Sequence, residues 1–333
     1  LHLVENGFVP GKKVGIYLNR SQKVPIAILS ILKGAGIFVP LDTAFPKERI
    51  EYIINDAHLD YILIEDDVAI TKVCDTKVEI INLDQVFKNV GNKTKVSPMS
   101  IYRKNDSVLY IYTSGSTGNP KGVDIPYSAI FNFCHAIMKT PGFKQEDTWI
   151  ALASISFDIS FTELILPVLM GSTVVIAPDQ RDVDGVSDLL AMHKVTIMQA
   201  TPTLLKMILN VNPNCMKSVK QVWATGERLP SNVAKRILKL EKILWNLYGP
   251  SEGTIETTVT QIKDSNSISI GSPLSNVQVY ICGDNLEILP LGVEGELVIA
   301  GDNLAKGYIN KTDLTKEKFV KLPFSKKRAY RTG

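Results

Sequence analysis

Two patterns of apolar and polar positions alternate along most of the chain. Short apolar runs predict buried strands at 14–18, 61–64, 79–83, 109–112, 149–153, 196–199, 219–224 and 243–247. Between them, apolar residues recur at helical spacing and predict helices at 24–33, 46–56, 126–138, 183–192, 203–209 and 231–240. Strand–helix alternation of this kind predicts an α/β fold with mostly parallel sheets covered by helices on both faces.

The pattern changes after residue 262. Short apolar runs at 278–281, 287–289 and 295–300 are broken by Gly, Pro and Asn. Hairpins and a small β-barrel suit these segments better than further strand–helix units. We therefore expect three parts, roughly 1–145, 146–262 and 263–333. The polar stretch 89–107 is expected to form a surface loop.

Composition and charge exclude several classes of protein. Hydrophobic residues make up 45% of the 333 residues and charged residues 21%, as in ordinary globular proteins. The net charge is +3, and no basic run interleaves with aromatics, so we expect no nucleic-acid partner. No apolar run reaches the roughly 18 residues that cross a membrane, so no membrane association is expected either.

Cysteine usage and the two chain ends add further expectations. The 4 cysteines and 4 histidines are scattered, which argues against a zinc site and favours reduced thiols. The chain begins at Leu1 without a signal peptide and stops at Gly333 directly after a motif-like segment. We expect that it has been cut at both ends.

The segment 112–122 carries the clearest chemical signal. It reads Tyr-Thr-Ser-Gly-Ser-Thr-Gly-Asn-Pro-Lys-Gly and follows the predicted strand 109–112. Glycines allow backbone N–H groups to approach an anion closely, hydroxyls add donors, and Lys121 adds a mobile positive charge. These features predict a loop that holds a phosphate chain.

Two alternatives for this loop fit less well. A nucleotide-binding P-loop needs Gly-x4-Gly-Lys-Ser/Thr, but the position five after Gly115 is Pro120, and Gly122 follows Lys121. A flexible linker would share the Gly and Ser content. The preceding strand together with Pro120 and Lys121 favours a fixed loop.

Two further segments pair a strand end with a carboxylate. Asn246–Glu252 reads Asn-Leu-Tyr-Gly-Pro-Ser-Glu, in which Tyr248 could stack on a base, Ser251 touch a phosphate and Glu252 hold Mg²⁺. The alternative is a turn in which Ser251 caps a helix. Asp158 follows the strand 149–153 and either caps a helix or holds a substrate ammonium group.

Taken together, these motifs resemble the amino-acid adenylation domains of nonribosomal peptide synthetases, within the larger family of adenylate-forming enzymes. Six segments stand in the family's order: 31–42, 113–123, 157–160, 246–252, 295–301 with 305–308, and 330–333. The resemblance runs the full length of the chain. It departs from the family at Ser251, where Thr is usual, at Lys306, where Arg is usual, and at Trp223, which is bulkier than expected.

The resemblance implies a reaction and its parts. A substrate carboxylate would attack the α-phosphorus of ATP, release pyrophosphate and leave an aminoacyl-adenylate bound with AMP-like contacts. Transfer to the phosphopantetheine arm of a carrier (thiolation) protein domain would follow. The resemblance also implies a C-terminal lid beyond residue 333, so the chain alone is expected to bind nucleotide but turn over poorly.

The site residues are carried over from the family position by position. Thr113, Lys121 and Glu252 are the expected catalytic groups, with Glu252 as the metal ligand. The nucleotide would contact the phosphate loop (Thr113, Ser114, Gly115, Ser116, Thr117, Gly118, Lys121), an adenine wall (Gly226, Glu227, Arg228) and the strand end (Asn246, Leu247, Tyr248, Gly249, Ser251, Glu252). A plain strand-to-helix loop is the alternative for 226–228.

The amino-acid pocket is implied in the same way. Its expected members are Asp158, Ile159, Thr162, Gln199, Trp223, Thr225, Leu247, Ile255 and Glu256, with Asp158 pairing the α-ammonium. Glu256 would favour a cationic or hydrogen-bonding substrate side chain, since an unpaired buried carboxylate is costly. The alternative is that Glu256 faces solvent or pairs within the protein.

Two other functions remain in competition. An acyl-CoA or aryl-acid ligase of the same superfamily would share the phosphate loop but has no need of Asp158. A non-catalytic nucleotide-binding module would bind ATP without amino-acid-dependent chemistry. The combination of Lys121, Asp158 and Glu252 favours amino-acid adenylation, and the expected setting is a cytoplasmic synthetase.

Overall fold

The computed structural model describes residues 7–66, 78–89, 102–114 and 120–333. The chain divides into two compact units. The first comprises 1–130, 154–157 and 305–316, and the second comprises 131–153, 158–304 and 317–333. Among the described residues, no helix is both long and apolar enough to span a bilayer.

The first unit is built on a seven-stranded sheet in the order β16-β6-β5-β2-β1-β3-β4. Strands β1 to β5 run parallel, while β6 pairs antiparallel with both β5 and β16. The strands are β1 (Lys13–Ile16), β2 (Ile37–Pro40), β3 (Tyr61–Ile64), β4 (Glu79–Asn82), β5 (Ser107–Thr113), β6 (Lys121–Pro126) and β16 (Gly307–Tyr308).

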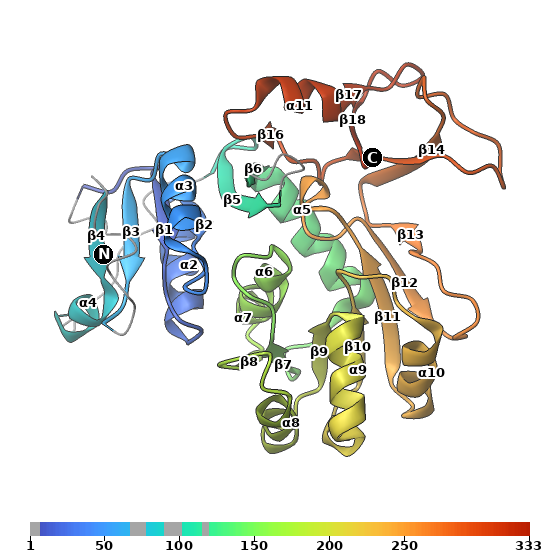
Figure 1. Cartoon of the computed structure of the whole chain (residues 1–333), viewed down its shortest axis with the longest axis horizontal. Coiled ribbons are helices and arrows are strands. Elements are labelled where there is room, and N and C mark those ends of the chain that lie inside the picture. The colour runs from blue at the N-terminus through green and yellow to red at the C-terminus, as the bar shows by residue number, and fades with distance from the viewer. Residues whose placement is uncertain (1–6, 67–77, 90–101, 115–119) are drawn as a thin grey trace. The chain divides into compact units, whose positions relative to one another are not determined.

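Helices cover this sheet because each presents one apolar stripe. The helices are α2 (Lys23–Lys33), α3 (Lys47–Ala57) and α4 (Leu83–Asn89). In α3, Ile50, Ile53 and Ile54 recur at helical spacing and are buried in the core with Val39 of β2 and Ile62 of β3. Figure 1 shows α2 and α3 running alongside β1 and β2.

The second unit contains a seven-stranded sheet in the order β13-β12-β11-β10-β9-β7-β8. Strands β7 to β11 are parallel, and β12 and β13 are antiparallel. The strands are β7 (Thr148–Ala151), β8 (Thr173–Ile176), β9 (Ile197–Ala200), β10 (Gln221–Ala224), β11 (Ile243–Tyr248), β12 (Thr258–Ile262) and β13 (Ser272–Pro273).

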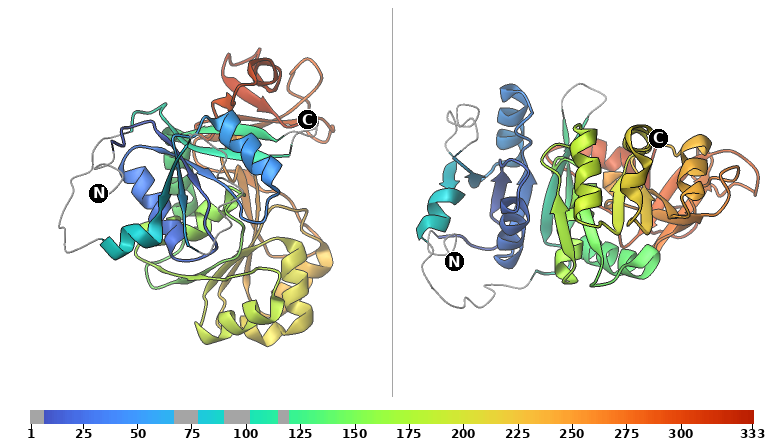
Figure 2. Two further views of the ribbon diagram at one scale, coloured as in Figure 1. Left: turned by 60° about the vertical axis from the view of Figure 1, so that its left-hand side comes forward. Right: turned by 90° about the horizontal axis from the view of Figure 1, so that it is seen from below.

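Two layers of helices belong to this second sheet. The helices α8 (Val183–Met192), α9 (Pro202–Val211) and α10 (Ser231–Lys239) bury their apolar stripes in one core with β9 and β10. They form one group in both further views (Figure 2). The other helices are α5 (Tyr127–Ile137), which begins in the first unit, α6 (Ile159–Leu164) and α7 (Leu166–Leu169).

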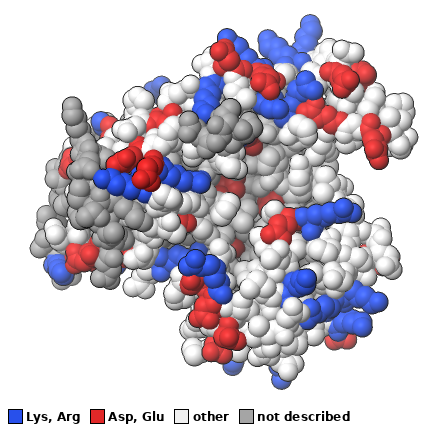
Figure 3. Space-filling model, in the orientation of Figure 1, with Lys and Arg blue, Asp and Glu red and all other residues white. Residues whose placement is uncertain are grey.

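Helix α10 shows how sequence pattern separates core from surface. Val233, Ala234 and Ile237 are buried, whereas Lys235 and Lys239 are exposed. Lys and Arg side chains gather over this helix on the face drawn in Figure 3. Its polar face therefore needs no partner beyond water.

The last part of the second unit is a four-stranded antiparallel sheet in the order β14-β15-β18-β17. Its strands are β14 (Val277–Cys282), β15 (Glu296–Gly301), β17 (Phe319–Lys321) and β18 (Arg328–Arg331), with α11 (Thr312–Lys318) preceding β17. The sequence predicted a small β-barrel in this region, and the structure has this four-stranded sheet there. At 287–289, expected as a strand, there is a single bridge between Ile288 and Cys282.

The predicted fold class is confirmed by the two helix-covered, mostly parallel sheets. Helix α8 begins and ends where the apolar periodicity placed it, and β3 matches its predicted run. The three-part division at about 145 and 262 stays a prediction. Most of the expected surface loop at 89–107 lies outside the described residues.

Candidate functional site

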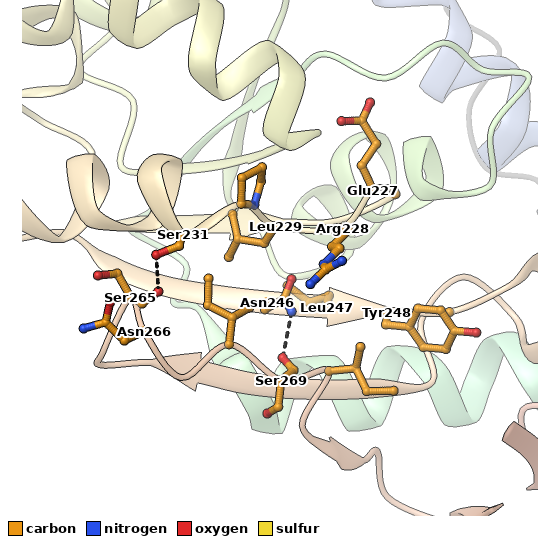
Figure 4. A pocket seen from close by; sticks show the side chains of 15 residues that line it. Glu227, Arg228, Leu229, Ser231, Asn246, Leu247, Tyr248, Ser265, Asn266 and Ser269 are labelled. Atoms are coloured by element: carbon orange, nitrogen blue, oxygen red, sulfur yellow. Dashed lines mark hydrogen bonds between the residues drawn. The ribbon is translucent and has the colours of Figure 1, made fainter. Parts of the chain in front are cut away.

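A cavity of about 1010 Å³ opens in the second unit beside the ends of β10 and β11. It is lined by Gly226–Ser231 after β10, by Asn246–Gly249 at the end of β11, and by residues of the segment 265–270 (Figure 4). Neighbouring parallel strands deliver their following loops to the same edge of a sheet, where open α/β folds bind ligands. The predicted adenine wall and the predicted strand-end residues are thus brought together.

Asn246 is oriented by a backbone contact within this cavity. Its Nδ2 donates to the carbonyl oxygen of Ser269 at 2.8 Å. In Figure 4 the bond leaves the amide oxygen directed away from Ser269. The side chain is buried, so a hydrogen-bond acceptor of fixed direction is available here.

The loop 226–228 is both a strand-to-helix connection and a cavity wall. Gly226 has φ +80°, a conformation that favours glycine. The Glu227 carboxylate accepts from the Thr203 backbone N–H at 3.1 Å and from the Thr203 hydroxyl at 2.6 Å. These bonds tie the loop to the start of α9, while the Arg228 side chain is exposed.

Tyr248 and Glu252 stand at the end of β11 and just beyond it. Tyr248 is half-buried, and its phenol pKa is raised by burial and by the nearby Glu252 charge. Glu252 is buried within the short 3-10 turn Ser251–Gly253. The N-cap residue of this turn is Pro250, and no side chain caps it. The Ser251 hydroxyl lies near the Asp158 carboxyl group and lowers its pKa.

Gly249 is a position where no side chain fits. A Cβ placed there would lie 2.5 Å from Glu256 Cα and 2.5 Å from the Ile255 carbonyl oxygen. Both are backbone atoms, so neither can rotate aside as a side chain would. The glycine allows the end of β11 to pass directly against the loop 255–257.

We expect Gly249→Ala to lower the free energy of unfolding by about 3 kcal/mol, since overpacking against backbone forces the loop to move. Gly292→Ala is the control, because Gly292 has φ +86° but nothing lies within 4 Å of its added Cβ. Gly292→Ala should lower the free energy of unfolding by only about 1 kcal/mol, because alanine disfavours a positive φ. Equal losses in denaturant unfolding would contradict the close approach at Gly249.

The loop that faces Gly249 is strained. Thr254 has φ 56° and Ile255 has φ 67°. Positive φ is a genuine outlier for β-branched residues, and each such residue costs of order 1–3 kcal/mol. The surrounding contacts must therefore hold this conformation, and strain of this kind concentrates at functional sites.

A second set of predicted residues lies buried on one face of the same sheet. Gln199 pairs with Trp223, and Trp223 pairs with Trp245, so these side chains share a face. Trp223 is fully buried and packs edge-on against Trp149, with ring centroids 4.8 Å apart. Trp223 thus fills space on this face, and its indole Nε1 donates a hydrogen bond to Gln221 Oε1 at 3.1 Å.

Asp158 occupies the N-cap position of α6 without a capping hydrogen bond, so capping does not account for it. Its side chain is 8% exposed, and burial raises the pKa of its carboxyl group, while the hydrogen bond from Ser251 opposes the shift. Oδ2 has no hydrogen-bond partner among the described residues. A buried carboxylate oxygen of this kind fits a cation.

Glu256 does not face solvent, and its side chain is 0% exposed. The Thr225 hydroxyl donates to Oε1, so part of the carboxyl group pairs within the protein. Oε2 has no partner among the described residues. Burial raises the pKa of this carboxyl group well above its usual range; Thr225 opposes the shift and the nearby Asp158 charge adds to it.

The two carboxyl groups belong to a wider set of unsatisfied oxygens. Within the described part of the chain, four buried oxygens of the predicted pocket lack a partner: Asp158 Oδ2, Thr162 Oγ1, Gln199 Oε1 and Glu256 Oε2. Gln199 is held in place because its Nε2 donates to the Ile159 carbonyl at 3.1 Å. Leu247 and Ile255 are buried as well. A cluster of acceptors favours a ligand rich in hydrogen-bond donors.

The raised pKa of Glu256 predicts how stability changes with pH. In the folded state the carboxyl group keeps its proton above pH 4.5, its ordinary pKa, whereas the unfolded state loses it. Folding stability therefore falls as pH rises from about 4.5 towards the folded-state pKa. Glu256→Gln removes this titration but preserves the shape of the neutral side chain.

We expect the stability of Glu256→Gln relative to the unmodified protein to increase with pH, by up to about 1.4 kcal/mol per pH unit. Denaturant unfolding of both proteins between pH 4 and pH 8 measures the difference. Asp158 titrates in both proteins, so its own contribution largely cancels. A difference that does not change with pH would show that Glu256 is ionised in the folded state.

The predicted phosphate loop lies in the first unit and is described only at its ends. Thr113 ends β5, and its buried Oγ1 has no partner among the described residues. Ser114 is exposed. Lys121 begins β6, and its Nζ lies 3.2 Å from the Tyr308 hydroxyl. Gly115, Ser116, Thr117 and Gly118 lie outside the described residues.

Glu163 is a residue that the sequence analysis missed. It is fully buried in α6, and its Oε2 accepts from the backbone N–H groups of Leu152 and Ala153 at 2.6 and 2.8 Å. It thereby joins the helix that carries Asp158 to the end of β7. A carboxylate inside the apolar run 159–168 was the available signal, because charged residues are rarely buried unless they are paired.

Comparison with known proteins gives consistent matches. Residues 1–309 match the AMP-binding enzyme family. The chain is 35% identical to a dimodular nonribosomal peptide synthase of Bacillus subtilis over 339 residues, covering 99% of this chain and 14% of the relative. The chain therefore spans only a small part of such relatives.

Solved structures agree with the sequence match. A four-domain nonribosomal peptide synthetase bound to AMP and glycine is 32% identical, with a TM-score of 0.87 over 100% of this chain and 25% of that one. The AMPPNP-bound form of the nonribosomal peptide synthetase FmoA3 is 25% identical, with a TM-score of 0.91 over 100% of this chain and 36% of that one.

Proposed function

Given that this chain belongs to the family of AMP-binding enzymes, we propose that it activates an α-amino acid with ATP. The products are an aminoacyl-adenylate and pyrophosphate. The observation that carries the proposal is Asp158, a buried carboxylate with one unpartnered oxygen inside a cluster of acceptors. The relatives that are nonribosomal peptide synthetases support the same activity.

Asp158 is proposed to receive the α-ammonium group of the substrate. Burial raises the pKa of its carboxyl group, so the protein surroundings alone disfavour the charged form. An ammonium group at Oδ2 supplies the missing opposite charge and hydrogen bond. The same contact gives an α-amino acid an advantage over an acid that lacks the amino group.

The nucleotide is proposed to lie in the cavity at the ends of β10 and β11. Gly226, Glu227 and Arg228 form one wall, and the oriented Asn246 amide oxygen meets the amino edge of adenine. Tyr248 stacks on the base. Gly249 and Ser251 are assigned to the part of the nucleotide nearest its α-phosphate.

The chemical step needs positioning more than covalent help. A carboxylate oxygen of the amino acid forms a bond to the α-phosphorus as the bond to the pyrophosphate oxygen breaks. Pyrophosphate leaves with that electron pair. The hydroxyls at 113–117 and the Lys121 ammonium are proposed to stabilise this developing charge, as in phosphoryl transfer generally.

Mg²⁺ is proposed to be held by Glu252. In the described residues, no three His, Cys, Asp or Glu side chains gather into a possible metal site. A single buried carboxylate fits Mg²⁺, which keeps several waters and takes its other ligands from phosphates. The ion supplies charge neutralisation at the phosphates; Glu252 fixes its place.

The similarity to nonribosomal peptide synthetases supports a proposal for the fate of the adenylate. We propose that the thiol of a phosphopantetheine arm on a carrier-protein domain attacks the adenylate carbonyl, forming a thioester and releasing AMP. An artificially fused adenylation–carrier protein of Klebsiella oxytoca shares the fold, at 24% identity and a TM-score of 0.90. We also propose that the protein acts in the cytoplasm.

The substrate side chain is proposed to be polar. Thr162, Gln199, Thr225 and Glu256 are buried and carry side-chain oxygen atoms, and three of these residues keep an unpartnered oxygen among the described residues. A side chain with an amine, amide or hydroxyl donor would satisfy them. Amino-acid-dependent exchange of pyrophosphate into ATP, across a panel of amino acids, tests both the activity and this preference.

A further inference from the structure

The strained loop 254–257 packs directly against Gly249 at the end of β11. It is also held by hydrogen bonds, one of which comes from the buried side chain of Asn303. Thr257 N donates to the Tyr248 carbonyl at 2.7 Å, and Leu274 N donates to the Thr257 carbonyl at 2.9 Å. The Glu256 carbonyl receives a hydrogen bond from Asn303 Nδ2 at 3.2 Å. Asn303 is 1% exposed and lies in the segment after β15, 47 residues further along the chain.

Asn303 is itself held by two further asparagines. Asn132 of α5 donates through Nδ2 to Asn303 Oδ1 at 2.6 Å and to the Ser275 carbonyl at 2.9 Å. Asn276 Nδ2 in turn donates to Asn132 Oδ1 at 2.9 Å. We call Asn276, Asn132 and Asn303 the asparagine relay.

The relay has only one consistent orientation. Backbone carbonyls can only accept, so the Ser275 and Glu256 oxygens require Nδ2 of Asn132 and of Asn303. The oxygen of each of these two amides then faces the preceding donor in the relay. Because every contact within it is buried or half-buried, reversing one amide would set two acceptors against each other.

The loop held by the relay carries pocket groups. Glu256 follows Ile255, whose backbone N–H lies near enough to the Asp158 carboxyl group to lower its pKa. The Glu256 side chain meets Thr225 on β10. A shift of the Glu256 backbone would therefore move Glu256 Oε2 and would also move the Ile255 N–H relative to Asp158.

We propose that Asn303 is a positioning residue for substrate selection, acting through the backbone of Glu256. This inference rests on the proposed function, because it gives the buried acceptor cluster the role of amino-acid pocket. Asn303 touches neither nucleotide nor amino acid in this account. Its role is to hold the loop in which Thr254 and Ile255 have positive φ, so that Ile255 and Glu256 stay in place at the pocket.

The decisive variant is Asn303→Asp in the complete protein. Asp keeps the size of the side chain and an oxygen that accepts from Asn132, but it replaces the donor to the Glu256 carbonyl with an acceptor. We expect the KM for the preferred amino acid to rise at least about tenfold and the preference among amino acids to weaken. The KM for ATP should stay within about twofold of its original value.

Asn285→Asp is the matched control, because Asn285 is exposed on the hairpin between β14 and β15. It should leave both KM values unchanged. A purely structural role for Asn303 would instead lower kcat through a smaller folded fraction, with both KM values and the amino-acid preference unmoved. That result would overturn the proposal.

Coupling to Glu256 is tested by combining variants. If Asn303 acts through Glu256, the effect of Asn303→Asp on the amino-acid KM should shrink at least about threefold in a Glu256→Ala background. Independent multiplication of the two effects would contradict action through Glu256.

Hydrogen exchange separates this inference from the proposed function. In the substrate-free protein, Asn303→Asp should speed amide exchange at 255–257 at least about tenfold, with the amides of α8 unchanged. If the unmodified protein activates no amino acid, the proposed function fails, and exchange alone decides whether Asn303 holds the loop. Unchanged exchange at 255–257 would show that it does not.

Discussion

Asp158→Ala is expected to reduce amino-acid-dependent ATP–pyrophosphate exchange by about 10²- to 5 × 10³-fold. Removing one partner of a buried ion pair costs about 3–5 kcal/mol, and each 1.36 kcal/mol corresponds to about tenfold in rate. The loss arises because the substrate ammonium group would be left in a pocket without its counter-charge. Steady-state exchange at saturating ATP measures it.

The controls for this prediction separate pocket chemistry from folding. Asp184→Ala, at an exposed position in the first turn of α8, should retain full exchange. Nucleotide binding by Asp158→Ala should be unchanged, because the adenine cavity is lined by other residues. If Asp158→Ala retained exchange, the ammonium contact would be wrong and an acyl-CoA or aryl-acid ligase would become the better account.

Glu252→Gln is expected to lower the exchange rate roughly 100-fold, since metal ions contribute several kcal/mol of charge stabilisation at reacting phosphates. The amide keeps the size of the buried side chain but loses the negative charge. The Mg²⁺ concentration that gives half-maximal exchange should rise at least about tenfold. A magnesium titration of both proteins checks both effects.

An exposed carboxylate provides the comparison for Glu252. Glu294→Gln, in the segment before β15, should leave the magnesium titration unchanged. If Glu252→Gln slowed exchange but left the magnesium dependence unaltered, Glu252 would act on the protein or nucleotide rather than on the metal ion. The proposed ligand assignment would then be wrong.

The fold followed closely from local patterns. Helix α8 and strand β3 were predicted to the residue because apolar spacing there is uninterrupted and the flanking residues are polar. The run 287–289 was predicted as a strand from the same kind of signal. It forms only a single bridge, because pairing depends on a partner strand that local sequence does not specify.

The sequence indicated which kinds of residue form the candidate site, but it did not indicate which of them contact one another. Carboxylates and hydroxyls at strand ends indicated chemistry, yet Thr225 and Glu256 lie 31 residues apart and meet only because the folded chain brings the loop before β12 to the end of β10. The asparagine relay joins residues up to 171 positions apart. The positive φ values at Thr254 and Ile255 had no sequence signal, since β-branched residues disfavour that conformation.

The most direct test of the account is ATP–pyrophosphate exchange by the complete protein with each of the proteinogenic amino acids and a set of diamino and hydroxy amino acids. We predict exchange that depends on an α-amino acid and is strongest for side chains that carry a hydrogen-bond donor. Nucleotide binding without exchange for any amino acid would contradict it.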